Sequence, residues 1–167
     1  MIREAVKEDI TAISKIHVDG WKYAYKGILP EDFLQNRSYE EQSNKWNNRY
    51  FNNEDTTEIV LVAEKEEGEV VGFISLDTVS KIEGVEGSIG ALYIDTSHHG
   101  KGYGTALFKA AVDILKKQGM KNFVLTAFKE NKKACRFYEA LGGIIFSEKT
   151  EIIGGVEAVG ITYIFEG

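Results

Sequence analysis

The sequence predicts an α+β fold, with a sheet of about seven strands and about four flanking helices. Three features support this: helical periodicity in the N-terminal third, a run of β-rich segments in the middle, and alternating strands and helices that end in a hairpin. The 167 residues are enough to build one buried core. We therefore expect a single domain over residues 1–167.

The N-terminal third is expected to be mostly helical after a short strand at 2–4. The isoleucines at 10, 13 and 16 lie three residues apart, so they share one face of a helix. Pro30 is the only proline, and its fixed φ and missing amide suit a first helical turn. A second helical region is therefore predicted after Pro30, continuing in pieces to about Phe51.

The middle of the chain changes to strand-like segments. Residues 58–63 and 70–76 are rich in Ile, Val and Phe, and the polar stretch between them contains Gly68. This pattern predicts a hairpin. A third strand is expected at about 86–94, which makes the middle an antiparallel meander.

The C-terminal third begins with an amphipathic helix after Gly104, in which the apolar residues recur at helical spacing. Gly119 is expected to end this helix as a left-handed cap. The pair Gly154 and Gly155 predicts a tight turn between two final strands. The remaining elements are a strand at 122–127, a helix at about 132–141, and strands at about 144–152 and 156–165.

Composition excludes several classes of function. A formal net charge of -6 argues against general binding of nucleic acid, which needs clustered Lys and Arg. The single cysteine, Cys135, has no disulfide partner within the chain, and no Cys/His group has the spacing of a zinc site. The N-terminus lacks a signal peptide, and no apolar run approaches the ~18 residues that span a bilayer. We therefore expect a soluble cytoplasmic protein with no metal and no membrane partner.

The most informative segment is the glycine loop "GKGYG" at 100–104, between a predicted strand and the amphipathic helix. Glycine lets the backbone approach a ligand closely, and the amides at a helix N-terminus attract anions, so the loop suits a phosphate group. Its spacing matches neither GxxxxGK[ST] nor GxGxxG, which disfavours a nucleotide hydrolase or a dinucleotide oxidoreductase. The alternative is a purely structural turn.

These residues resemble the signature of the GNAT superfamily of N-acetyltransferases. The signature is Gln or Arg, two residues, Gly, one residue, then Gly or Ala, and this chain has His99-Gly100-Lys101-Gly102-Tyr103-Gly104. His99 departs from the pattern, because it stands where the family has Gln or Arg. A second segment, "ENKKACRFYEALGG" at 130–143, is similar to a later motif of the family.

The resemblance implies a GNAT-like mixed, mostly antiparallel sheet in which the fourth and fifth strands splay apart, with acetyl-CoA as cosubstrate in the gap. The amide of Leu92 would polarise the thioester carbonyl, and Ile94 would hold the pantetheine arm. Asn131 would contact the same arm, and by its position it also suits an N-cap. The diphosphate would lie on the loop, and the residues expected there are His99, Gly100, Lys101, Gly102, Tyr103, Gly104 and Thr105.

Catalysis needs a neutral amine, yet an alkylamine with a pKa near ~10.4 is about 99.9% protonated at pH 7. Some members carry a catalytic glutamate where this chain has Ser88, so we consider Glu86, acting through water, as the base. Tyr138 matches the family position that protonates the leaving thiolate. The alternatives are a solvated carboxylate for Glu86 and a packed helix aromatic for Tyr138.

The acceptor is expected to be a small-molecule or peptide amine, and the acidic balance favours a cationic one. Two other functions stay open: an acyl-CoA-binding module without catalytic activity, and a plain interaction domain. A homodimer through the exposed edge of the C-terminal hairpin is possible. Several aromatic residues are candidates for the acceptor site, although most are expected in the core: Trp21, Tyr23, Tyr25, Trp46, Tyr50 and Phe51.

Overall fold

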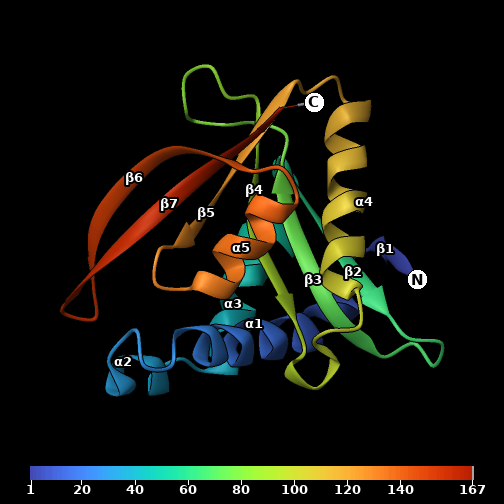
Figure 1. The fold of residues 1–167 in the computed structure, drawn as a ribbon. Helices are drawn as coiled ribbons and strands as arrows, with labels where there is room; N and C mark the ends of the chain where they lie inside the picture. Colours follow the sequence, from blue (N-terminus) through green and yellow to red (C-terminus); the bar gives the residue numbers. More distant parts are fainter. Residues whose placement is uncertain (167) are drawn as a thin grey trace.

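The computed structural model describes residues 1–166, which contain a seven-stranded sheet in the order β1-β2-β3-β4-β5-β7-β6 (Figure 1). The strands are β1 (Ile2–Glu4), β2 (Glu58–Glu64), β3 (Val70–Asp77), β4 (Gly87–Ile94), β5 (Asn122–Phe128), β6 (Ile144–Ile153) and β7 (Val156–Glu166). The helices are α1 (Ile10–Tyr25), α2 (Glu31–Gln35), α3 (Tyr39–Trp46), α4 (Tyr103–Lys117) and α5 (Lys132–Ala140). The predicted α+β class and the seven strands are confirmed.

The described chain has five α-helices where about four were expected. The difference lies in the region after Pro30, which breaks into α2 and α3. Helix α2 ends at Gln35, and α3 starts after Ser38, whose backbone is extended and whose Oγ accepts a hydrogen bond from the Glu41 amide at 3.1 Å. A helical turn, Asn47–Phe51, continues α3 toward β2.

The strand pairing agrees with the predicted meander and hairpin. Strands β2, β3 and β4 are antiparallel neighbours, and so are β5, β7 and β6. The turn between β6 and β7 is formed by Gly154 and Gly155, whose φ angles of 59° and 85° are easily adopted only without a side chain. Strands β4 and β5 are parallel, and α4 connects them.

The parallel pairing of β4 and β5 is short and leaves a gap in the sheet. Only Gly87 with Phe123 and Ser88 with Val124 are paired, after which the two strands diverge (Figure 1). The edge of β4 from Ile89 onward therefore has no strand partner on the β5 side. This confirms the splay that the family resemblance implies.

Strand β4 contains a bulge at Gly90. Leu76 pairs with Ile89 and Ser75 with Ala91, so Gly90 is an extra residue on β4. A Cβ on Gly90 would lie 2.9 Å from the Ser75 Oγ, closer than real Cβ contacts allow. The position therefore needs glycine as long as the serine stays in place.

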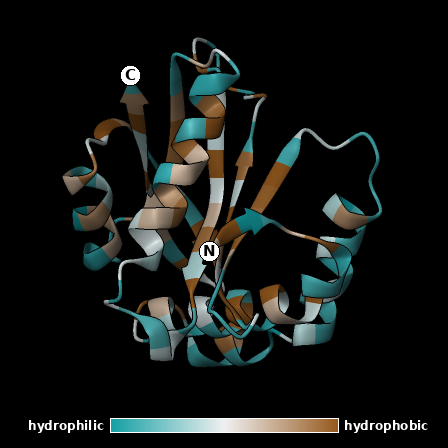
Figure 2. Ribbon diagram, turned by 90° about the vertical axis from the view of Figure 1, so that its right-hand side faces the viewer, coloured by the Kyte–Doolittle hydropathy of each residue, from teal (hydrophilic) through white to brown (hydrophobic). Residues whose placement is uncertain are grey.

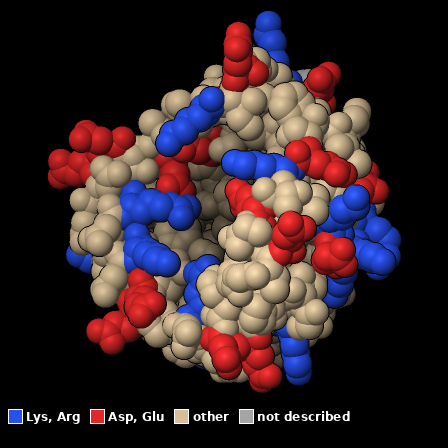
Figure 3. All heavy atoms as spheres, turned by 90° about the vertical axis from the view of Figure 1, so that its left-hand side faces the viewer, with Lys and Arg blue, Asp and Glu red and all other residues tan. Residues whose placement is uncertain are grey.

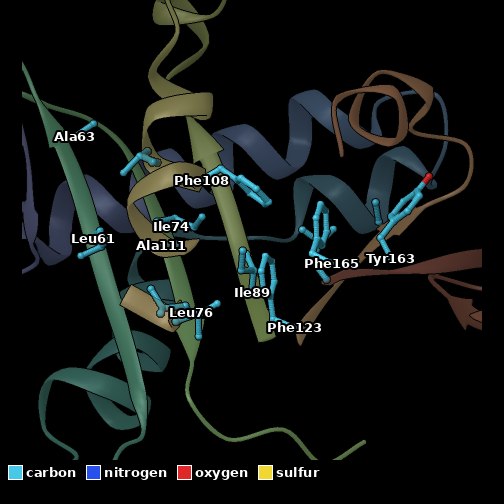
Figure 4. Close-up of a cluster of buried hydrophobic side chains, with 14 of the residues drawn as sticks. Leu61, Ala63, Ile74, Leu76, Ile89, Phe108, Ala111, Phe123, Tyr163 and Phe165 are labelled. Carbon is cyan, nitrogen blue, oxygen red and sulfur yellow. The ribbon is translucent and has the colours of Figure 1, made fainter. Parts of the chain in front are cut away.

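The helices bury their apolar stripes against both faces of the sheet. Helix α4 places Leu107, Phe108 and Ala111 against strands on both sides of the gap (Figure 4). On the opposite face α1 and α3 contribute Ile13 and Trp46 to a second cluster. Full burial of a leucine or isoleucine stabilises by roughly 1.5–3 kcal/mol. The strands are largely apolar, and the helices show polar outer surfaces (Figure 2).

Trp21 and Trp46 are 8% and 1% exposed, which confirms the core placement favoured for most of the aromatic candidates. Within residues 1–166, no helix has the length and apolar character needed to cross a membrane.

Candidate active site

A cavity of about 530 Å³ occupies the gap between β4 and β5, a volume typical of small-molecule sites. Its walls come from α1, the end of β4, the glycine loop, β5 and α5. The face of the molecule toward which the gap opens is hollowed near its centre (Figure 3). All but two of the predicted site residues line this cavity: Leu92, Ile94, His99, Gly100, Gly102, Tyr103, Gly104, Thr105, Asn131 and Tyr138.

The glycine loop has the backbone that an anion site needs. Gly100 and Gly102 have φ angles of 75° and 87°, and Gly102 is the N-cap residue of α4. The amides from His99 to Thr105 donate to no protein acceptor within the described chain. They lie at the positive end of a 15-residue helix, where a negatively charged ligand is stabilised.

The amides of Leu92 and Ile94 face the gap. The Asp95 amide donates to the Val71 carbonyl at 2.8 Å, so the N–H of Asp95 points toward β3. Because the bonding direction alternates along a strand, Leu92 and Ile94, at odd distances from Asp95, present their amides to the opposite edge. Beyond the bulge, that edge is the open gap. These amides can therefore bind an extended ligand as an added strand would.

The side chain of His99, the residue that departs from the family signature, links the glycine loop to β4 by a hydrogen bond. Its Nε2 donates to the Ile94 carbonyl oxygen at 3.0 Å, since a carbonyl only accepts. The Tyr23 ring meets the imidazole edge-on at a centroid distance of 5.2 Å. Lys101 is exposed and does not line the cavity, so its predicted contact with the ligand stays a prediction.

Tyr138 packs as expected of a helix aromatic and also lines the cavity, and its role as the proton donor stays a prediction. Its ring packs beside Phe137 at a centroid distance of 5.3 Å and lines the cavity. Burial raises the pKa of the Tyr138 phenol, so at neutral pH the group holds its proton and is suited to donate it. Asn131 is confirmed as the N-cap of α5, because its Oδ1 accepts a hydrogen bond from the Ala134 amide at 3.3 Å.

Glu86 lies apart from the cavity. It precedes β4, and its carboxylate accepts a hydrogen bond from the Lys121 amide at 2.5 Å. Its own amide donates to the Asn122 Oδ1 at 2.8 Å, so Glu86 links the start of β4 to β5 at the end where the two strands are paired. Five strand residues lie between it and Leu92, a spacing of roughly 20 Å. Its role as the base stays a prediction, and the geometry shows a different function for its carboxylate.

The cavity wall also includes Tyr93 and His98, for which no site role was predicted, and Tyr25, which was considered only for the acceptor site. Burial raises the pKa of Tyr25, and its neighbours Tyr93 and Asn131 lower it in turn. His98 is 9% exposed, with its Nδ1 2.7 Å from the Asp95 carboxylate. No local pattern distinguishes these residues from core aromatics or loop histidines.

Comparison with known proteins gives the family. The model of the Acetyltransferase (GNAT) family matches residues 21–143. The chain is 33% identical over 156 residues to the uncharacterized N-acetyltransferase YuaI of Bacillus subtilis, which covers 93% of this chain and 86% of that protein. It is 25% identical over 138 residues to a spermidine N(1)-acetyltransferase of Thermoplasma acidophilum, covering 82% and 83% of the two chains.

A solved structure with the same fold is the PaiA N-acetyltransferase of Thermoplasma acidophilum in complex with coenzyme A. It has a TM-score of 0.70 and 21% identity, and the alignment covers 100% of this chain and 98% of that one. The segment matched by the family model contains the strand gap, the glycine loop and the helix of Tyr138. The chain belongs to the GNAT family of acetyltransferases.

Proposed function

We propose that the protein transfers the acetyl group of acetyl-CoA to a primary amine by direct attack within a ternary complex. The observation that carries this proposal is the set of unpaired amides, from His99 to Thr105, at one end of the gap between β4 and β5. A diphosphate accepts hydrogen bonds from such amides, and the neighbouring strand edge offers amides to a pantetheine arm.

The residues present fit coenzyme A. Gly100 and Gly102 keep side chains away from the loop amides, so phosphate oxygens can approach the backbone. Ile94 and Leu92 supply gap-facing amides, and Asn131 lies on the opposite wall beside Tyr25. Bound acetyl-CoA supplies an activated acetyl group as a thioester, which reacts with an amine to give an amide and a free thiol.

The chain itself supplies two groups to this reaction. The Leu92 amide is placed to donate to the oxygen on which negative charge develops as the new C–N bond forms. The protonated Tyr138 is placed to donate its proton to the sulfur as the C–S bond breaks and the electron pair stays on sulfur. The amine loses its proton to water, and the Tyr138 phenolate recovers a proton from solvent.

Two measurements test this function. Coenzyme A at 100 times its Kd adds about 2.7 kcal/mol to the free energy of unfolding, so a thermal-shift titration detects binding. No shift at saturating concentrations contradicts the site and favours an interaction domain. Thiol release from acetyl-CoA with a panel of amines then tests catalysis. Binding without thiol release identifies the alternative, an acyl-CoA-binding module without activity.

The acceptor class proposed at this level is a small-molecule or peptide amine. The Thermoplasma relative is named for spermidine, which supports a small amine but not a particular one. A cytoplasmic location is proposed because the free thiol of Cys135 is buried and unpaired within the described residues, as expected in a reducing compartment.

We also propose a homodimer through β6. This edge strand is exposed nearly throughout, and it presents Ile144, Ile145, Phe146 and Ile152 to solvent. A second copy is the occupant that a self-complementary strand edge favours. Sedimentation equilibrium tests this, since Ile145→Lys is expected to give a monomer if wild type is a dimer. A monomeric wild type contradicts it.

A further inference from the structure

Three basic side chains act on the His17 imidazole at the α1–α3 side of the gap. The His17 imidazole lies on α1 against Trp46 and Tyr93, and its pKa is lowered to about 4. Burial is the largest cause, followed by the positive charges of Arg37, Arg49 and Lys45. All the charges that act on this ring are cationic, in a chain whose net charge is -6.

Arg49 lies beside a residue of the cavity wall, although it does not itself line the cavity. Its Nη2 lies 3.9 Å from the point where a Cβ on Gly90 would be, and Gly90 lines the cavity. The guanidinium is held by two hydrogen bonds to Glu58, at 2.6 and 2.7 Å, and lies over the Trp46 ring at 4.6 Å. Three of its five N–H groups donate to no acceptor in the part of the chain that the structure describes.

An unpaired hydroxyl lies beside this cation. The Ser75 side chain is 0% exposed, and its Oγ has no hydrogen-bond partner among residues 1–166. It lies 2.9 Å from the same Cβ position on Gly90. Buried hydroxyl groups are normally paired, because leaving one unpaired costs about 1–3 kcal/mol. The glycine bulge is therefore next to the Arg49–Glu58 pair and a buried hydroxyl, which a ligand reaches once the Ser75 side chain turns toward the cavity.

We propose that the Gly90 bulge, with Arg49 and Ser75, forms a subsite that binds the carboxylate of the acceptor, so that the acceptors are α-amino acids or closely similar carboxylate-bearing amines. This inference rests on the proposed transferase function and specifies its substrate class. A carboxylate is recognised by arginine N–H pairs, whereas a polycation such as spermidine would meet the cations of this face.

The spacing suits an α-amino acid. Gly90 and Leu92 are two residues apart on β4, which corresponds to roughly 6.6 Å. That span accommodates an amine at the carbonyl polarised by Leu92 and, one carbon away, a carboxylate hydrogen-bonded at the bulge. A carboxylate oxygen at the Cβ position of Gly90 would lie 2.9 Å from the Ser75 Oγ, which is too close for a carbon atom but is a hydrogen-bond distance between oxygens.

The test compares acceptors that differ only in the carboxylate. Thiol release from acetyl-CoA is measured with alanine and phenylalanine, with their C-terminal amides, and with spermidine. The amine of an amino-acid amide is less basic than that of the free acid, so basicity alone favours the amide. We expect the acids to have at least 10-fold higher kcat/KM than the amides. Equal values or a preference for amides or spermidine would overturn the subsite while leaving the transferase function intact.

Arg49→Gln then tests whether Arg49 causes the preference for acids over amides. Hydrogen bonds to a charged group predict a loss of roughly 10- to 100-fold in kcat/KM for the acids, carried by KM, with a change below about threefold for the amides. A fold defect would lower both acceptor types equally, and that result contradicts the proposal. Lys117→Gln removes the same charge from the far end of α4 and is the matched control.

A second variant and a binding measurement make the test independent of turnover. Gly90→Ala is made together with Ser75→Ala, because the new methyl group would otherwise lie 2.9 Å from the Ser75 Oγ. We expect this double variant to lose the preference for acids while the thermal shift with coenzyme A is kept. Calorimetric titration of the coenzyme A complex with phenylalanine and phenylalaninamide needs no reaction. Tighter binding of the acid is expected, and equal binding rejects the subsite even if no amine is acetylated.

Discussion

His17 is expected to make the stability of the fold depend on pH between about 4 and 6.5. Its pKa is lowered from 6.5 to about 4, chiefly by burial. The Trp46 Nε1 donates to its Nδ1 at 3.2 Å, which a protonated ring does not accept. In this pH range the unfolded chain binds a proton at His17 and the folded chain does not, so the free energy of unfolding falls as pH falls.

The magnitude follows from the shift. About 2.5 pKa units at 1.36 kcal/mol per unit give roughly 3 kcal/mol, present in full above pH 6.5 and lost once pH falls below about 4. That is a large part of the free energy of unfolding of a typical protein, which is about 5–15 kcal/mol. Asp9 and Asp95 also have lowered pKa values, but from a starting value of 3.8, so their contribution is lost mainly at lower pH.

Urea unfolding followed by tryptophan fluorescence, at pH 4.5 to 7.5, measures this dependence in wild type and in His17→Gln. Glutamine keeps an acceptor for the Trp46 indole but does not titrate. We expect the wild-type slope to approach 1.4 kcal/mol per pH unit in the acidic half of the range and to exceed that of the variant by about 1 kcal/mol per pH unit. Equal slopes in the two proteins would refute the assignment.

Four further substitutions give distinct outcomes. Tyr138→Phe is expected to lower kcat about 100-fold in the thiol-release assay without changing the thermal shift by coenzyme A, and equal turnover removes its role as acid. Glu86→Gln is expected to leave kcat and the pH–rate profile unchanged, because the carboxylate binds the Lys121 amide. If the variant no longer shows the fall in rate at low pH, Glu86 is restored as the base. Gly102→Ala strains a φ of 87° by roughly 1–2 kcal/mol and is expected to lower both Tm and coenzyme A affinity. Ser75→Ala removes an unpaired buried hydroxyl, so urea unfolding should show no loss of stability, and a loss above 1 kcal/mol would reveal a partner.

Local chemistry accounts for what the sequence predicts correctly. The helical period after Gly104, the N-cap at Asn131 and the Gly154–Gly155 turn depend on residues close together in the chain, and each is confirmed. The glycine loop also depends on a local requirement, two left-handed backbone positions at Gly100 and Gly102. These features need no knowledge of the strand order.

The features that were missed depend on long-range register. The place of Glu86 relative to the cavity depends on where β4 and β5 pair, because Glu86 lies at the paired end of these strands, next to Lys121 and Asn122. The proximity of Arg49 to Gly90 arises because a helical turn from the N-terminal third packs across a strand forty residues later. No local sequence pattern encodes either relation, so neither can be predicted from hydrophobic periodicity.

The distinction between local sequence features and long-range contacts also applies to charge. The net charge of -6 favours a cationic acceptor only if the acidic residues are near the site. Coulombic interactions between exposed groups are largely screened beyond about 8 Å at physiological salt, so the nearest charges determine what binds. Around the buried His17 these are Arg37, Arg49 and Lys45. Raising the salt concentration should therefore weaken the binding of an anionic acceptor. The sign of this change is determined by the three cations and not by the net charge of the chain.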